Sequence, residues 1–104
     1  MLAAVRRYHD AYKALAAAGV RQMYPTLAPD QFDQLRRSFD AITAYEVDAR
    51  QPRVELRNDT ATVRALVVRR IVPKVGRAVT NEVETEFRLR RDPRGWLITD
   101  VRAR

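Results

Sequence analysis

The residues of this sequence that could do chemistry are few, and their spacing matches no catalytic motif. His9 is the single histidine, and an imidazole with an ordinary pKa titrates near neutral pH, as general acid–base catalysis requires. Asp10, Asp40 and Asp100 are the carboxylates best placed to approach a buried pocket, where loss of hydration would raise their pKa. Simpler interpretations are a partly exposed His9 on a helix flank and a solvated Asp40. Asp100 can form a simple ion pair with Arg102. Because each has such a simpler interpretation, His9, Asp40 and Asp100 are only candidate catalytic residues.

Metal, thiol and phosphate-loop chemistry are not expected. The sequence contains no cysteine, one histidine and three glycines. It therefore lacks the ligand clusters of a metal site and the glycine-rich loop that cradles phosphates. Ser38 has no orienting acid or oxyanion hole in the pattern around it. We predict no metal and no cofactor.

The composition is typical of one soluble globular domain. The 104 residues are 46% hydrophobic and 32% charged, which leaves room for a single core. The longest apolar runs, residues 14–20 and 65–68, are far shorter than the roughly 20 residues of a membrane helix. The lack of cysteine fits a reducing cytoplasm. We expect a cytoplasmic domain without membrane contact, which is either excised from a longer bacterial signalling or enzyme chain or a very compact complete protein.

The positive charge of the chain is spread out, although its formal net charge is +7. Glu82, Glu84 and Glu86 alternate along the chain just before Arg88 and Arg90. A nucleic-acid-binding protein instead gathers its positive charge on one face, with aromatic residues inside it. Nucleic-acid binding is therefore the third of the three functions that we consider.

Three helices are predicted in the first 43 residues. Apolar residues at steps of three and four predict a first helix that continues through residues 16–18 and ends at Gly19. Residues 20–24 read as a short helix stopped by Pro25. A third helix begins near Pro29, which suits a first turn because its missing N–H costs nothing there. The apolar stripes of the two long helices are Leu2, Val5, Tyr8, Tyr12 and Leu15, then Phe32, Leu35, Phe39 and Ile42.

From Ala44 the apolar period changes to two, as in a β-strand. Pro52 interrupts this pattern and predicts a bulge, bend or edge position. Asn58-Asp59 predicts a two-residue hairpin turn. A last turn is expected at residues 92–95, followed by a strand to Ala103. The facing of this last strand is ambiguous, because its apolar residues point to both sides.

One register of the central hairpin satisfies both faces of the sheet. With a loop at residues 73–77, Val63 faces Phe87, and the apolar residues of both strands share one side. Arg64 then faces Glu86 on the other side, as cross-strand pairing requires. Arg69 and Asn81 pair with each other as odd polar members of the apolar side. They lie either at the solvent-exposed rim of the sheet or at the mouth of a pocket.

This order of elements resembles the nuclear-transport-factor-2-like superfamily, which includes ketosteroid-isomerase-like and polyketide-cyclase-like proteins. The resemblance implies an α+β, cone-shaped fold over residues 1–104. The N-terminal helices, two long and one short, would pack in a curved antiparallel sheet of four or more strands, with a pocket at the open end and frequent dimerisation through the outer face of the sheet. Residues 16–18 are alanines where related sequences offer a short acidic residue. The resemblance rests on Val5-Arg6-Arg7-Tyr8, Ala11-Tyr12, residues 20–25, residues 59–63, Phe87-Arg88-Leu89 and Gly95-Trp96-Leu97-Ile98.

Two sites follow from these patterns. An apolar ligand pocket is expected among the aromatic side chains, which alternatively fill the core outright. A homodimer interface is expected on the outer sheet face, which alternatively is covered by a helix or by more chain. The predicted function is a non-catalytic association and small-molecule-binding module, and the alternative is a cofactor-free isomerase, dehydratase or cyclase. The predicted pocket residues are Tyr8, Tyr12, Met23, Tyr24, Tyr45 and Trp96, and the predicted interface residues are Arg64, Leu66, Val68, Val72 and Glu84.

Overall fold

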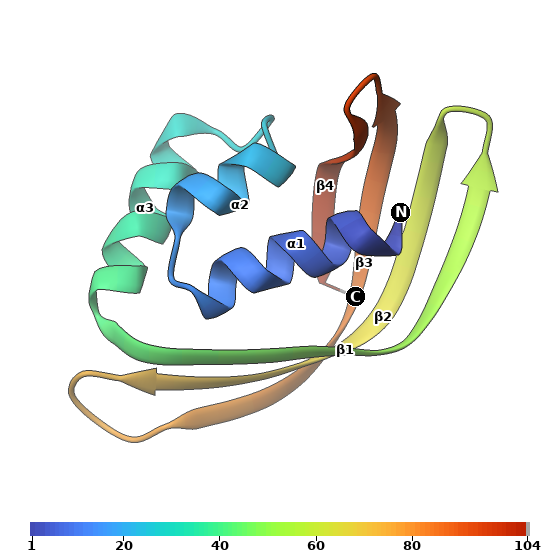
Figure 1. Cartoon of the computed structure of the whole chain (residues 1–104). Coiled ribbons are helices and arrows are strands. Elements are labelled where there is room, and N and C mark those ends of the chain that lie inside the picture. The colour runs from blue at the N-terminus through green and yellow to red at the C-terminus, as the bar shows by residue number, and fades with distance from the viewer. Residues whose placement is uncertain (104) are drawn as a thin grey trace.

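The computed structural model describes residues 1–103, in which three helices precede a four-stranded antiparallel sheet (Figure 1). The strands follow one another as a meander in the order β1-β2-β3-β4. The sheet curves around α1, so all three helices lie on its concave face and the convex face carries no helix (Figure 1). The predicted α+β class is confirmed. The elements are α1 (Leu2–Lys13), α2 (Ala17–Met23), α3 (Pro29–Asp40), β1 (Ile42–Arg57), β2 (Thr60–Pro73), β3 (Val79–Asp92) and β4 (Gly95–Ala103).

The predicted register of the β2–β3 hairpin is confirmed. Val63 pairs with Phe87, and Arg64 pairs with Glu86. The predicted Asn58-Asp59 turn joins β1 to β2, with Asn58 in the left-handed region at φ 50°. Pro52 lies in the predicted irregularity, since the β1–β2 register shifts between Arg50 and Arg53.

The first helix is shorter than predicted, and Gly19 does not end it. α1 stops at Lys13, and Leu15 adopts a left-handed backbone at φ 53°. α2 then begins at Ala17 and contains Gly19 in its interior. A Cβ atom on Gly19 would lie 3.0 Å from the Cβ of Ala11, so glycine allows α2 to pack tightly on α1. This packing buries Val20 at 1% exposure, which favours a break over a longer helix.

The last strand contains a bulge at Thr99 that explains its ambiguous pattern. Leu89 pairs with Ile98, whereas the preceding Arg88 pairs with Asp100, so Thr99 is the extra residue. Its hydroxyl donates to the Arg88 carbonyl oxygen at 3.2 Å. Because the bulge reverses the alternation, Ile98 and Val101 both pair with concave-face residues of β3.

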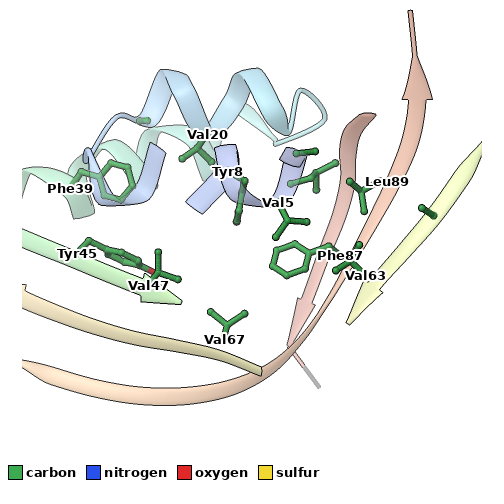
Figure 2. Packing of buried hydrophobic residues seen from close by; sticks show 14 residues of the cluster. Val5, Tyr8, Val20, Phe39, Tyr45, Val47, Val63, Val67, Phe87 and Leu89 are labelled. Carbon is green, nitrogen blue, oxygen red and sulfur yellow. The ribbon is translucent and has the colours of Figure 1, made fainter. Parts of the chain in front are cut away.

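The core lies between α1 and the concave face. Figure 2 shows Val5 and Tyr8 of α1 above Val63, Val67 and Phe87 of the sheet. α2 and α3 close the core from the far side of α1 (Figure 1). The largest fully buried side chains are Phe87, Leu89, Ile98, Val20 and Val63.

Candidate functional site

Three tyrosines meet on the concave side of the sheet. Tyr8 and Tyr12 are one helical turn apart on α1, and the Tyr8 hydroxyl donates to the Tyr12 hydroxyl at 3.2 Å. The Tyr45 ring, from β1, lies 5.0 Å from the Tyr12 ring between centroids. Burial raises the pKa of all three hydroxyls, so they stay protonated at neutral pH. The cluster therefore offers neutral hydrogen-bonding groups.

His9 is buried next to this cluster, so its interpretation as a partly exposed residue is wrong. The side chain is 8% exposed, and its ring meets the Phe87 ring edge-on at 5.5 Å. Burial lowers the pKa of His9 to about 4, and the positive charges of Lys13 and Arg69 act in the same direction. The imidazole is thus neutral at physiological pH.

A cavity of about 50 Å³ lies between these side chains and the centre of the sheet. Arg69 of β2 lines it, and its Nε donates to Asn81 Oδ1 of β3 at 3.2 Å. Of the two interpretations of the Arg69–Asn81 pair, the structure supports a polar group at a pocket for Arg69, whereas Asn81 does not line the cavity. No aspartate or glutamate of the described residues lines the cavity. The lining residues are Tyr8, His9, Tyr12, Tyr45, Val47, Val67, Arg69, Thr85, Phe87 and Val101.

A larger cleft of about 340 Å³ opens between α1 and strands β1 and β2. Its walls are mostly apolar, and Ala49 and Ala65 leave space beneath the helix because their side chains are small. His9 and Val47 line both the cleft and the 50 Å³ cavity. This cleft was not predicted from the sequence, although alanines on the concave faces of two paired strands were the available signal. The lining residues are Leu2, Val5, Arg6, His9, Asp10, Lys13, Val47, Asp48, Ala49, Pro52, Val63 and Ala65.

The six predicted pocket residues do not all come together. Tyr8, Tyr12 and Tyr45 line the 50 Å³ cavity. Met23 and Trp96 instead line a broad groove beside the N-terminal turn of α1 and the β3–β4 turn. Tyr24 is half-buried just after α2, where burial raises its pKa.

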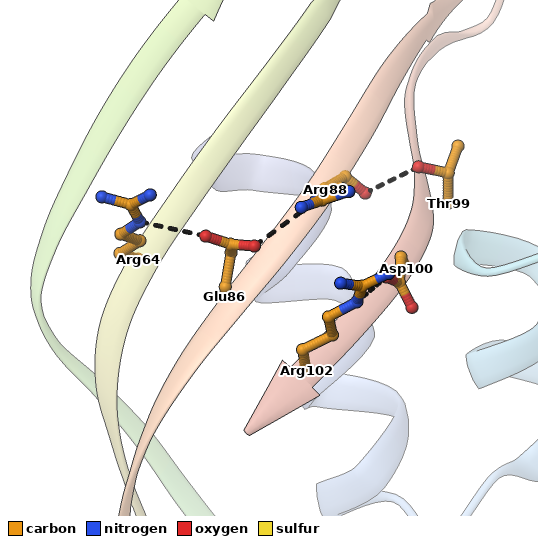
Figure 3. A network of polar contacts seen from close by, with 6 residues as sticks. All are labelled: Arg64, Glu86, Arg88, Thr99, Asp100 and Arg102. Carbon is orange, nitrogen blue, oxygen red and sulfur yellow. Dashed lines mark hydrogen bonds and ion pairs between the residues drawn. The ribbon is translucent and has the colours of Figure 1, made fainter. Parts of the chain in front are cut away.

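Of the three carboxylates expected to approach a pocket, Asp10 lines the 340 Å³ cleft, whereas Asp40 and Asp100 line neither the cleft nor the 50 Å³ cavity. Asp40 is exposed at the last turn of α3. Asp100 pairs with Arg88 across the β3–β4 ladder and forms an ion pair with Arg102 (Figure 3). The expectation is therefore wrong for Asp40, which faces solvent, and for Asp100, which the bulge at Thr99 turns to the convex face.

The convex face carries a network of charges. Glu86 accepts hydrogen bonds from Arg64 at 3.1 Å and from Arg88 at 3.3 Å (Figure 3). The Arg64 bond is the main reason that the pKa of Glu86 falls below its ordinary value. Leu66, Val68 and Val72 share this face, as predicted from the register, but they are half-buried and not openly exposed. The predicted interface residues Arg64 and Glu84 flank them, and dimerisation stays a prediction.

Comparison with solved structures identifies the fold. A provisionally assigned aromatic ring hydroxylase from Novosphingobium aromaticivorans is 20% identical, with a TM-score of 0.87 over 99% of this chain and 90% of that one. A provisionally assigned dehydratase of the NTF2-like family from Streptomyces avermitilis is 14% identical, with a TM-score of 0.80 over 96% and 89%. The association domain of CaMKII from C. elegans is 15% identical, with a TM-score of 0.75 over 98% and 90%. No family model matches the sequence, and no curated protein matches it.

The chain therefore has the nuclear-transport-factor-2-like fold, and the resemblance seen in the sequence is confirmed at the level of the fold. This fold fits a ligand-binding or an enzymatic module. Within residues 1–103, no helix has the length and apolar character needed to cross a membrane. The same residues contain no group of three or more histidine, aspartate or glutamate side chains placed to hold a metal ion.

Proposed function

We propose that this chain is a non-catalytic association and small-molecule-binding module, whose ligand lies in the cleft between α1 and the sheet. The observation that carries the proposal is the make-up of the site. A mostly apolar cleft of about 340 Å³ meets a cluster of neutral hydrogen-bonding groups at His9. Apolar walls with a few polar anchors are typical of small-molecule sites.

The protonation states of the cluster argue against turnover. An efficient general acid or base has a pKa near the working pH. The pKa of His9 is lowered to about 4, and the pKa values of the tyrosines are raised. At neutral pH the tyrosine hydroxyls therefore stay protonated and the His9 imidazole stays neutral, so none of these groups readily gives up or accepts a proton.

The range of proteins that share the fold supports this assignment without deciding it. The CaMKII domain from C. elegans is an association domain, whereas the S. avermitilis protein is provisionally assigned as a dehydratase. Fold alone does not choose between these classes. The site chemistry of this chain is closer to binding.

Filling the cleft should block ligand uptake. Ala49→Trp places an indole inside the cleft, so the uptake of an apolar fluorescent dye should fall steeply relative to the wild type. Ala44→Trp is the matched control, because Ala44 lies on the same strand but pairs with Val72 of the convex face. Fluorescence titration measures the effect. Dye uptake that is equal in the two variants would contradict the proposed ligand site.

Association through the convex face should depend on Leu66. Leu66 lies at the centre of this face, between Arg50 of β1 and Glu84 of β3. Leu66→Asp adds a charge beside Glu84, which should convert a homodimer to a monomer at tens of micromolar. Light scattering measures the mass, and Thr99→Asp, on the edge strand β4, serves as a surface control. A wild type that is already monomeric at this concentration would rule out the association.

The position of His9 favours one second candidate, a cofactor-free acid–base enzyme. His9 lines both the cleft and the cavity, so a bound molecule would contact its neutral imidazole. A substrate turned over by the wild type, but not by His9→Ala, would favour this alternative over a binding module.

A further inference from the structure

Arg69 occupies an unusual place for a charged residue. It lies on the concave side of β2, in the row that contains Val67 and Ile71. Its side chain is half-buried and lines the 50 Å³ cavity. A guanidinium in such surroundings needs polar partners, because its charge loses hydration there.

The partners of Arg69 satisfy only part of its capacity. Its Nε donates to Asn81 Oδ1 at 3.2 Å, and an arginine carries five N–H donors. Within residues 1–103, Arg69 forms no ion pair with a carboxylate, whereas Arg64 and Arg88 both pair with Glu86. On the convex face Arg64 and Arg88 thus share the carboxylate of Glu86, whereas Arg69 in the cavity has no carboxylate partner among the described residues.

The groups around Arg69 are suited to an anion. A hydrogen bond from Arg69, and then its charge, oppose the rise in the pKa of the Tyr45 hydroxyl. The charge of Arg69 also opposes the rise in the pKa of Tyr12 and helps to lower the pKa of His9. Tyr12 accepts the hydrogen of Tyr8, which leaves its own hydroxyl hydrogen free to donate. Arginine and hydroxyl donors around a small space form the usual recognition set for a carboxylate.

We propose that Arg69 and the Tyr12 hydroxyl bind the carboxylate of a small, mainly apolar acid, whose apolar body lies in the cleft beside α1. This inference rests on the proposed ligand-binding function and adds the chemical class of the ligand. A monoanion fits better than a phosphate dianion, because the cavity holds one cation and only about 50 Å³ of space. His9 and Val47 line both the cleft and the 50 Å³ cavity, so the two spaces are neighbours. A molecule with an acidic head in the cavity and an apolar body in the cleft would therefore contact His9 and Val47.

Calorimetric titration with 3-phenylpropionate and with the matching alcohol, 3-phenylpropanol, tests the inference at pH 7.5. The wild type should bind the carboxylate about tenfold or more tightly than the alcohol, as expected for a charge-assisted pair. Arg69→Gln should remove this preference while leaving the alcohol affinity unchanged. Arg70→Gln is the matched control: it removes the same charge from an exposed residue that pairs with Thr80, and it should keep the preference. If Arg69→Gln fails to fold, NMR of the wild type replaces it: the Arg69 Nε–H signal should shift with the acid and not with the alcohol.

The possible outcomes separate the two proposals. Equal affinities for acid and alcohol in the wild type, or an unaltered preference in Arg69→Gln, would overturn the carboxylate site and leave the apolar cleft intact. Tighter binding of inorganic phosphate than of 3-phenylpropionate would also overturn the ligand class. Failure of both phenyl probes and of the apolar dye to bind would overturn the proposed ligand-binding function, and this inference with it.

Discussion

Replacing Phe87 with alanine should lower the free energy of unfolding by about 3–5 kcal/mol, the usual cost of removing a large core side chain. Phe87 is 1% exposed and pairs with Val63, which is fully buried. Its ring also meets the Tyr8 ring edge-on, with 5.9 Å between centroids (Figure 2). The substitution therefore opens a cavity where the sheet meets α1. Urea unfolding followed by circular dichroism measures the loss.

A matched control separates burial from a general effect of shortening side chains in the sheet. Leu56 belongs to the same concave face, since it pairs with Ala61, but it is 52% exposed. Leu56→Ala should cost less than about 1 kcal/mol, because little apolar area returns to water. If Phe87→Ala does not fold, Phe87→Leu should give a smaller loss in the same direction. A Phe87→Ala loss as small as that of Leu56→Ala would contradict the packing described above.

The register of the β2–β3 hairpin could be predicted because two independent constraints agree on it. Pairing Val63 with Phe87 collects the apolar side chains on one face. The same register pairs Arg64 with Glu86 on the other, and a shift by one residue would break both sets at once. The loop between β2 and β3 added a local signal, since Gly76 adopts a positive φ. Local chemistry and long-range pairing therefore gave the same answer.

The end of α1 and the bulge at Thr99 could not be predicted, because tertiary packing decides them. Alanines at residues 16–18 favour a continued helix, yet the chain breaks at Leu15 so that α2 can fold back and bury Val20. In β4, a regular strand and a bulged strand both place apolar residues on each face. Only the pairing of Ile98 with Leu89 distinguishes them.

Only part of the candidate site could be predicted, because tertiary packing also decides which of its side chains come together. Tyr8 and Tyr12 come together because they are one turn apart on α1, which periodicity reveals. The burial of His9 depends on the curvature of the sheet, which covers a wider arc of α1 than the apolar stripe suggests (Figure 1). The curvature of the sheet also separates Met23 and Trp96 from the tyrosines. It leaves the 50 Å³ cavity and the groove lined by Met23 and Trp96 at opposite ends of α1.

The burial of His9 should make the protein sensitive to mild acid. An unfolded chain exposes the imidazole, whose ordinary pKa is near 6.5, whereas burial lowers the pKa of the folded state to about 4. Between these values the unfolded state binds more protons, so stability is fully present above about pH 6.5 and falls as the pH falls. From pH 7 to pH 5 the free energy of unfolding should drop by about 2 kcal/mol. Urea unfolding at the two pH values measures this difference.

Two variants assign the acid sensitivity to His9. His9→Phe keeps an aromatic ring against Phe87 but cannot bind a proton, so its stability should be almost equal at pH 7 and pH 5. Glu86→Gln should retain the full drop, because the pKa of Glu86 is lowered from 4.5 and its titration falls below this range. The sequence has one histidine, so no other side chain of ordinary pKa titrates in the interval. A wild-type protein equally stable at both pH values would mean that the folded imidazole is hydrated, and the neutral cluster proposed as the ligand's polar anchor would lose its basis.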